Sequence, residues 1–205
     1  MGLDHRAEEW TMTPMPTFER IATGLDVQPL LGLLELKSEL WDEIIVRQKV
    51  QGSPHKNTEC IFVRGPEEFS VDKYFYDLGS YDYPAIKILE QAIVPLLKPL
   101  LTEVLRVTEL GRVLIVKFKP GGHIDKHVDE GTYADYFARF HVVLKTNPRA
   151  TLTVGGHERN LGAGEAWYFN HKLEHYGDNK GDEDRIHIIF DAVTELYPMV
   201  SVPTT

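Results

Sequence analysis

The sequence predicts a mainly β protein with flanking helices, built around a double-stranded β-helix (jelly-roll) core. Beyond about residue 107, short apolar runs alternate with turn residues, which is typical of such a core. Before that point, two segments space their apolar residues as helices do. No flexible linker or internal repeat divides the 205 residues, so one domain is expected. The apolar runs cover residues 112–118, 123–128, 137–144, 150–154, 165–169 and 185–193.

The domain is expected to begin after a polar N-terminal arm. Residues 1–16 show no apolar periodicity and contain two prolines, so we predict a flexible arm. The remainder, 17–205, is predicted to form the single domain. Helical support is expected over about 25–106, and the β-barrel over about 107–195.

Two helices are predicted in the supporting half. The first is an amphipathic helix over Val27–Val46. Its apolar residues are Leu30, Leu33, Leu34, Leu40, Trp41 and Ile44. Pro84 is expected to open the second helix, which Pro95 and Pro99 then kink or divide.

Two shorter patterns predict strands. Cys60–Arg64 is apolar and β-branched, which indicates a short strand between the helices. Gly155-Gly156 follows the strand pattern Thr151–Val154, and a glycine pair suits a two-residue hairpin turn.

Composition narrows the possible functions. The net charge of −9 and the isoelectric point near 5.5 argue against a nucleic-acid-binding surface. Cys60 is the single cysteine, so no intramolecular disulfide is expected, which fits a reducing cytoplasm. We see no signal peptide and no apolar run that would span a membrane, so a soluble cytoplasmic protein is predicted, with no membrane partner. The oligomeric state stays open.

The most informative pattern is His127-Val128-Asp129, followed by His175 and then Arg185. Two histidines and one carboxylate are the ligand set of the facial triad that holds non-haem Fe(II). On a strand, residues two apart share a face, so His127 and Asp129 are placed to grip one metal ion. An arginine such as Arg185 suits one carboxylate of a dicarboxylate co-substrate.

Two strands place further polar residues on one face. Alternation puts Arg139 and His141 opposite an apolar face, and it does the same for Arg185, His187 and Asp191. Either these faces line a polar cavity inside a barrel, or they belong to an ordinary sheet with one solvated face. The neighbouring ligand set favours the cavity.

Several stretches carry a resemblance to a known family. They are Pro120–Asp129, Arg139-Phe140-His141, Gly164–Asn170, Glu174-His175 and Asp184–Asp191, with looser similarity over Ser53–Pro66. With these, the chain resembles the aspartyl/asparaginyl β-hydroxylases, a branch of the 2-oxoglutarate- and Fe(II)-dependent dioxygenases that includes free-proline hydroxylases and small bacterial and phage members. The similarity covers the C-terminal half well.

The resemblance implies a cofactor set and a reaction. Fe(II) would be bound by His127, Asp129 and His175, which would also be the catalytic centre. 2-Oxoglutarate would be held by Arg185, with Arg139 and His141 beside it. With O₂, the enzyme would hydroxylate an unactivated C–H bond, most simply in an amino acid or an amino-acid-like small molecule.

Alternatives remain at this point. His123-Ile124-Asp125 is a second His-x-Asp pair, and spacing on a regular strand cannot choose between the two; the resemblance aligns the later one. His123, Asp125 and Arg64 are candidate substrate contacts. We expect the remaining histidines, His55, His157 and His171, at the surface. Rival functions are a peptidyl Asp/Asn-type hydroxylase, a cupin-like metalloenzyme that does not use 2-oxoglutarate, and a binding module without turnover.

Overall fold

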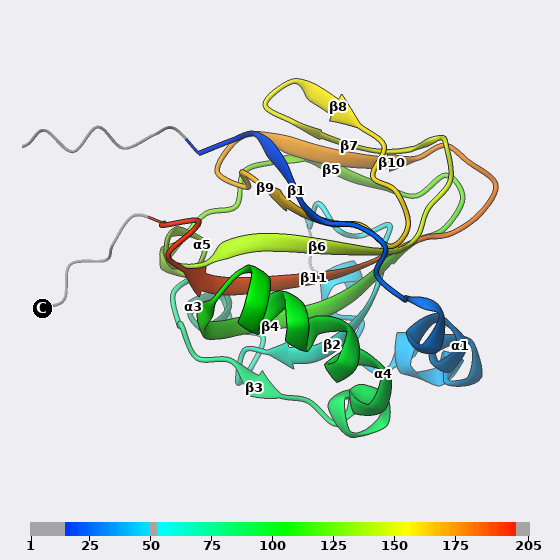
Figure 1. The fold of residues 1–205 in the computed structure, drawn as a ribbon, viewed down its shortest axis with the longest axis horizontal. Coiled ribbons are helices and arrows are strands. Elements are labelled where there is room, and N and C mark those ends of the chain that lie inside the picture. The colour runs from blue at the N-terminus through cyan, green and yellow to red at the C-terminus, as the bar shows by residue number, and fades with distance from the viewer. Residues whose placement is uncertain (1–14, 50–52, 200–205) are drawn as a thin grey trace, which may run out of the picture.

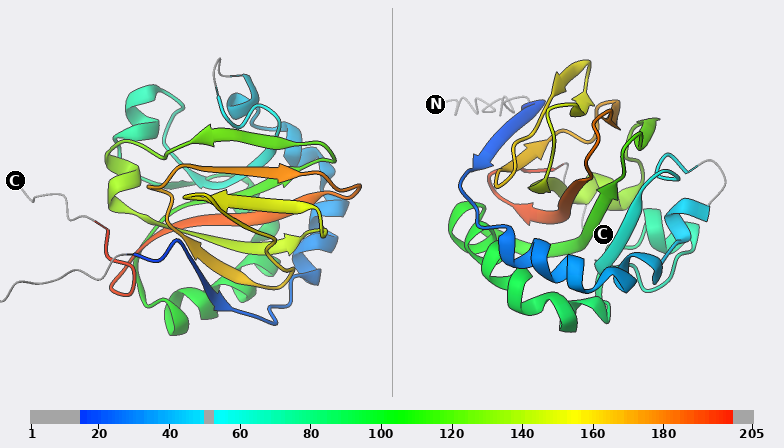
Figure 2. Two further views of the ribbon diagram at one scale, coloured as in Figure 1. Left: turned by 90° about the horizontal axis from the view of Figure 1, so that it is seen from above. Right: turned by 90° about the vertical axis from the view of Figure 1, so that its right-hand side faces the viewer.

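The computed structural model of the protein describes residues 15–49 and 53–199. The predicted arm therefore lies outside the described residues, apart from its last two. Two antiparallel β-sheets face each other, and helices cover the outer face of the larger sheet (Figure 1; Figure 2). The predicted fold class is confirmed: the protein is mainly β, with flanking helices on a jelly-roll core.

The larger sheet has seven strands in the order β1-β9-β6-β11-β4-β2-β3. Its strands are β1 (Phe18–Ala22), β2 (Glu59–Gly65), β3 (Tyr81–Asp82), β4 (Val107–Phe118), β6 (Ala138–Lys145), β9 (Ala166–Phe169) and β11 (Arg185–Thr194). The long central pair β4 and β11 runs through the middle of this sheet, flanked by β2 and β6.

The smaller sheet has four strands in the order β5-β10-β7-β8. Its strands are β5 (His123–His127), β7 (Ala150–Val154), β8 (His157–Arg159) and β10 (His175–Asn179). The predicted turn joins β7 to β8, with φ of +54° at Gly155 and +80° at Gly156. Both values lie in the left-handed region, which explains the glycine pair.

Helices α1 (Gln28–Leu36) and α4 (Ala85–Pro99) bury one face each against the larger sheet. Helix α4 follows Pro84, as predicted, and Pro99 is its last residue before a π-helical turn, η2 (Leu100–Val104). The buried side of α4 repeats every three or four residues, at Ala85, Leu89, Ala92, Ile93, Leu96 and Leu97. These side chains belong to the same buried cluster as Ile188 and Phe190 of β11.

The single helix predicted over Val27–Val46 is wrong. The chain forms α1, then a 3₁₀-helix η1 (Ser38–Asp42), then the short α2 (Val46–Lys49). After Leu34 the next apolar positions at helical spacing would be 37 and 38, but these are lysine and serine. The helical phase is lost there, and η1 instead buries Leu40 and Trp41.

The faces of the central strands differ as the alternation predicts. Along β11, Ile186, Ile188 and Phe190 belong to the core beneath the helices. Arg185, His187 and Asp191 are also buried, but on the face turned toward the smaller sheet. The polar face therefore lines a cavity, and the solvated-face alternative does not hold.

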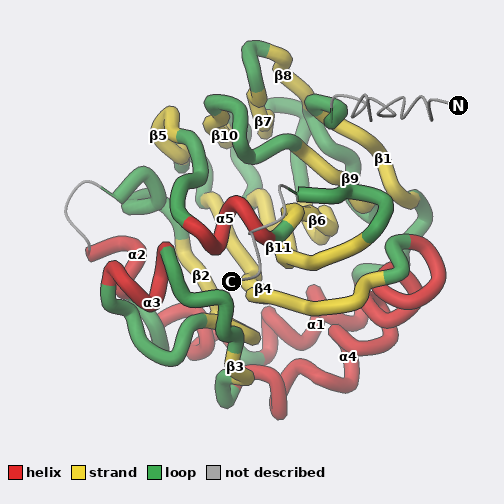
Figure 3. Tube along the Cα trace, turned by 90° about the vertical axis from the view of Figure 1, so that its left-hand side faces the viewer, coloured by secondary structure: helices red, strands yellow, loops and turns green. Residues whose placement is uncertain are grey.

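Two short helices lie near one end of the β-sandwich, α3 (Val71–Phe75) and α5 (Thr132–Tyr136), and Figure 3 shows α2 near them. The Ser70 hydroxyl caps α3 by accepting a hydrogen bond from the Lys73 amide at 3.4 Å. Neither α3 nor α5 was predicted, and both are only five residues long. Among the described helices, none has the length and apolar composition needed to cross a membrane.

Candidate metal centre and its two cavities

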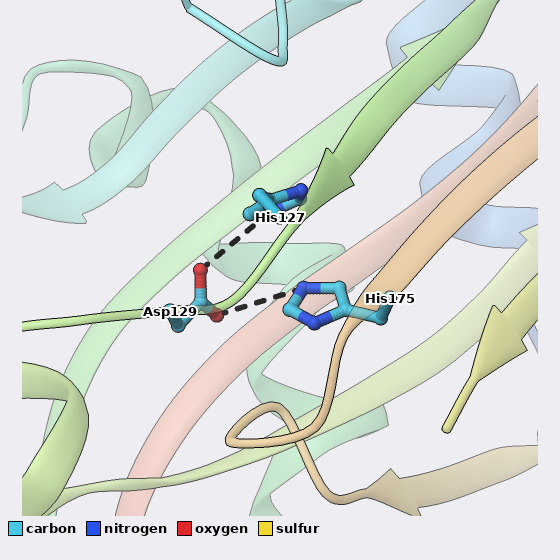
Figure 4. Close-up of side chains that lie close together, drawn as sticks. All are labelled: His127, Asp129 and His175. Atoms are coloured by element: carbon cyan, nitrogen blue, oxygen red, sulfur yellow. Dashed lines mark ion pairs between the residues drawn. The ribbon is translucent and has the colours of Figure 1, made fainter. Parts of the chain in front are cut away.

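Three metal-ligating side chains meet between the sheets (Figure 4). His127 ends β5, Asp129 follows it by two residues, and His175 begins β10, directly opposite His127 in the strand pairing. One carboxylate oxygen of Asp129 lies 3.6 Å from Nε2 of His127, and the other lies 3.9 Å from Nε2 of His175. One donor atom from each residue lies within 4.8 Å of the other two.

Backbone carbonyls fix the orientation of both histidine rings. Nδ1 of His127 lies 2.8 Å from the carbonyl oxygen of Asp125, and Nδ1 of His175 lies 2.9 Å from that of Leu173. A carbonyl accepts only, so Nδ1 carries the proton in each ring and Nε2 presents its lone pair. Burial lowers the pKa of His175 to about 4, so its ring is neutral, as a ligand must be.

A bulge in β5 separates the two His-x-Asp pairs. Between β10 positions 175 and 177, the partner in β5 moves from His127 to Ile124, three residues rather than two. Ile124 and His127 therefore both line the inner cavity, whereas His123 and Asp125 point outward. The Asp125 carboxylate pairs with His123 and with Lys56, each at 3.2 Å.

Asp129 is held by an arginine that is itself held by a second carboxylate. Arg139 donates to both oxygens of Asp191, from Nε at 2.8 Å and from Nη2 at 3.1 Å. Its remaining terminal nitrogen donates to Asp129. Burial raises the pKa of Asp129, but Arg139 and the nearby histidines outweigh it and hold the pKa well below the usual range. The carboxylate is thus ionised.

An inner chamber of about 40 Å³ lies next to these ligands, deep between the sheets. His127 and His175 form one part of its wall, and Arg185, His187 and His141 form another. Nδ1 of His141 lies 3.1 Å from Nδ1 of His187, and Nε2 of each ring is buried without a partner among the described residues. Burial and then Arg185 lower the pKa of both rings well below the usual value, so both are neutral.

Arg185 is a buried cation without an anion. Its side chain stacks over the Phe118 ring at 4.5 Å, and Nη2 lies 3.4 Å from Nδ1 of His187. Among the described residues, no carboxylate lies within 4.0 Å of its guanidinium. Burial lowers the pKa of Arg185 to about 10. A buried charge of this kind is stabilised when an anionic ligand pairs with it.

An outer cavity of about 440 Å³ lies on the other side of the metal-ligating cluster. His127 and Arg139 border both cavities, and Asp129 faces the outer one. Its wall comes from α2, α3, the chain around α5, and β4. Among its lining residues are Arg47, Phe69, Tyr74, Phe75, Arg112 and Tyr133.

Other predicted site residues lie elsewhere. Arg64 lines neither cavity, because its guanidinium bonds the Asp82 carboxylate at 2.5 Å and the carbonyls of Ser80 and Gly111. His123 and Asp125 also line neither cavity. The structure therefore does not place these three predicted substrate contacts in the site.

Two histidines that we expected at the surface are not there. His55 lines both cavities, with its ring 5.1 Å from that of His127, and His171 is fully buried, bonded through Nε2 to the Ala134 carbonyl at 2.9 Å. His157 is exposed, as expected. His55 and Arg47 were missed because they lie far from the ligand pattern in the sequence and share no spacing with it, His55 in a turn and Arg47 in the short helix α2.

A family model of the aspartyl/asparaginyl β-hydroxylases matches residues 83–195, just over half of the chain. The protein belongs to this family. The matched range contains His127, Asp129, His175 and Arg185, whereas Arg47 and His55 lie outside it. Membership and the cluster of two histidines and one aspartate fit a metal-dependent hydroxylase.

Several solved structures are similar to part of this chain. One is a predicted oxalate decarboxylase from Thermotoga maritima, with 14% identity, coverage of 41% of this chain and 67% of that one, and a TM-score of 0.34. Another is a cupin domain from Bordetella pertussis, with 19% identity, coverage of 42% and 85%, and a TM-score of 0.34. A third is a conserved protein of unknown function from Streptococcus pyogenes, with 14% identity, coverage of 43% and 68%, and a TM-score of 0.33. No curated protein matches the sequence.

Proposed function

We propose that this hydroxylase depends on Fe(II) and 2-oxoglutarate, and that it oxidises an unactivated C–H bond of an amino acid or an amino-acid-like small molecule. One observation carries the proposal. The metal-ligating histidines and a buried arginine without a carboxylate partner share one small chamber between the sheets. A dicarboxylate that chelates the metal at one end and pairs with a guanidinium at the other would explain why the histidines and the arginine lie in the same chamber.

The donor set fits iron. Two imidazoles and one ionised carboxylate supply three ligands, which leaves further coordination positions of the metal for a co-substrate and O₂. When bound there with 2-oxoglutarate, Fe(II) supplies O₂ activation coupled to oxidative decarboxylation, which yields succinate, CO₂ and a hydroxylated product. His127, Asp129 and His175 would hold the ion.

The chain's own residues bind and orient. Arg185 would pair with the distal carboxylate of 2-oxoglutarate, and the pairing would relieve the cost of burying an isolated charge. His187 and His141 would offer their free Nε2 atoms beside it. Phe118 and the apolar side chains around Arg185 keep water from this end of the chamber, which strengthens the pairing.

Arg139 was predicted to help hold 2-oxoglutarate, but its partners favour another role. Its guanidinium already meets two carboxylates, Asp191 and Asp129, so its charge is compensated within the protein. We assign Arg139 to orienting Asp129 at the metal and leave the co-substrate to Arg185 and the two histidines. An ionised carboxylate in this ligand position also favours hydroxylation over halogenation, which needs a free site for halide.

The rival functions leave features unused. Neither a cupin-like metalloenzyme without 2-oxoglutarate nor a binding module without turnover requires a buried arginine such as Arg185 beside the metal ligands. A peptidyl substrate stays a second candidate, although a cavity volume of about 440 Å³ suits a small molecule.

The test is a turnover assay. Purified protein is incubated with Fe(II), 2-oxoglutarate and a panel of amino acids and short peptides, while O₂ uptake and succinate are measured. We expect O₂ uptake that requires 2-oxoglutarate and a product heavier by one oxygen atom. Metal-dependent turnover of a panel member without 2-oxoglutarate would instead support the cupin-like alternative.

A further inference from the structure

Two buried arginines in the outer cavity have no role in the metal site. Arg47 comes from α2 and is 9% exposed, and Arg112 comes from β4 and is 3% exposed. Both line the outer cavity, which opens on Asp129 and His127, and Arg47 also borders the inner chamber. Long charged side chains are seldom buried this deeply unless they are paired.

Neither arginine has a compensating anion. Arg47 donates a hydrogen bond from Nη1 to the Cys60 sulfur at 3.8 Å, and sulfur is a weak acceptor. Arg112 donates from Nη2 to the Lys73 carbonyl at 3.2 Å, and its guanidinium lies 3.6 Å from the centre of the Tyr133 ring. Nε of each is buried without a hydrogen-bond acceptor, and within 15–49 and 53–199 no carboxylate lies within 4.0 Å of either guanidinium.

Other arginines of the chain show that this pattern is not general. Arg139 shares the same cavity but is paired with Asp191 and Asp129. Arg64, near the end of β2, meets Asp82 and two carbonyls. Among the described residues, Arg47 and Arg112 thus differ from Arg139 and Arg64 in having no carboxylate partner, and both line the outer cavity beside the candidate metal ligands.

We propose that the outer cavity binds a substrate that carries a carboxylate or phosphate group, which pairs with Arg47 and Arg112. The anion supplies the compensation that the protein lacks, and guanidinium groups match the geometry of both kinds of anion. The proposal names the substrate class of the proposed hydroxylase and rests on that function in calling the ligand a substrate.

The other side chains of the cavity wall indicate which chemical groups the rest of the substrate carries. Phe69, Tyr74, Phe75 and Tyr133 present aromatic surface, and Leu114 adds an aliphatic side chain. A substrate with an apolar part between its anionic group and the metal would make favourable contacts with these side chains. The C–H bond to be oxidised would then lie on that apolar part, on the side of His127 and Asp129.

Binding is tested without iron or turnover, so the result does not depend on the proposed chemistry. The background is metal-free protein carrying Arg185→Met, which removes the inner anion site. Isothermal titration measures the binding of glutamate, of its diamide, in which both carboxylates are replaced by amides, and of inorganic phosphate. Arg47→Met and Arg112→Met are compared with Arg149→Met, a control at an exposed arginine in the turn between β6 and β7.

We expect glutamate to bind at least about 10-fold more tightly than its diamide, which has no carboxylate. Arg47→Met and Arg112→Met should each weaken glutamate binding about 10- to 100-fold, as expected for loss of a hydrogen bond to a charged group, and the control should not change it. Tighter binding of phosphate than of glutamate would identify a phosphate ester as the source of the anion.

Stability separates a binding role from a structural one. Because Arg47 is unpaired in the free protein, Arg47→Met should leave the melting temperature unchanged or raised. The proposal is overturned if neither anion binds, if the diamide binds as tightly as glutamate, or if both variants keep the affinity of the background for both anions.

Discussion

Replacing Arg185 by methionine separates two effects of its buried charge, one on the stability of the free protein and one on the affinity for 2-oxoglutarate. Methionine keeps an unbranched side chain of similar reach but removes the guanidinium. In the free protein, burial lowers the pKa of Arg185 from its ordinary value to about 10, and a shift of that size corresponds to about 3 kcal/mol against the charged form. At neutral pH the arginine is fully charged, so this cost is present and the substitution removes it.

Arg185→Met should therefore be at least as stable as the parent. Lost stacking on Phe118 offsets part of the gain, so a rise of about 0–3 kcal/mol in the free energy of unfolding is expected. Affinity for 2-oxoglutarate should fall instead. Losing one partner of a buried ion pair costs about 3–5 kcal/mol, or about two to four orders of magnitude in Kd.

The assay pairs calorimetric titration of 2-oxoglutarate into anaerobic Mn(II)-loaded protein with denaturant unfolding of the free protein. Arg64→Met is the matched control, because Arg64 has three protein partners and lines neither cavity. It should lose stability and keep 2-oxoglutarate affinity, the reverse of Arg185→Met. Parent-like 2-oxoglutarate affinity in Arg185→Met would refute the reasoning.

Three further outcomes are expected. His127→Ala should abolish stoichiometric Fe(II) binding measured by metal analysis, whereas His123→Ala, outside both cavities, should keep it; the reverse result would move the ligands to the earlier pair. Asp129→Gly should fold, as circular dichroism would show, but hydroxylate at a small fraction of the parent rate; a parent-like rate would mean that Asp129 is not a ligand. Gly131→Ala should lower the melting temperature and weaken metal binding, because φ is +92° there and the added Cβ would lie 2.4 Å from a backbone oxygen at the end of α3. Gly156→Ala, with φ of +80° but open space, should cost only the strain of about 1–3 kcal/mol and leave metal binding intact; equal effects of the two variants would contradict this.

Local alternation was enough to predict much of the barrel. The run 150–154 coincides with β7, and 185–193 with all but the last residue of β11, because each alternates or stays apolar throughout. None of the apolar runs in the sequence covers β10, the strand that carries His175. Its sequence, His-Tyr-Gly-Asp-Asn, has little intrinsic strand preference, and it is a strand because β5 and β7 pair with it on both sides.

The choice between the two His-x-Asp pairs could not be made from spacing. It depends on the bulge in β5, which turns His127 inward after Ile124, and a bulge leaves no reliable mark on the sequence. The pairing of Arg139 with Asp191 also could not be predicted from the sequence. Alternation placed Asp191 on a polar strand face, but only the register between β6 and β11 brings it opposite Arg139.

The central claim is that one chamber holds the metal at one end and the distal carboxylate of 2-oxoglutarate at the other. A crystal structure of the protein with Mn(II) and 2-oxoglutarate, which does not turn over, tests it most directly. We predict one ion bound by His127, Asp129 and His175, and the distal carboxylate of 2-oxoglutarate paired with Arg185. An ion bound elsewhere, or 2-oxoglutarate bound away from Arg185, would contradict the claim.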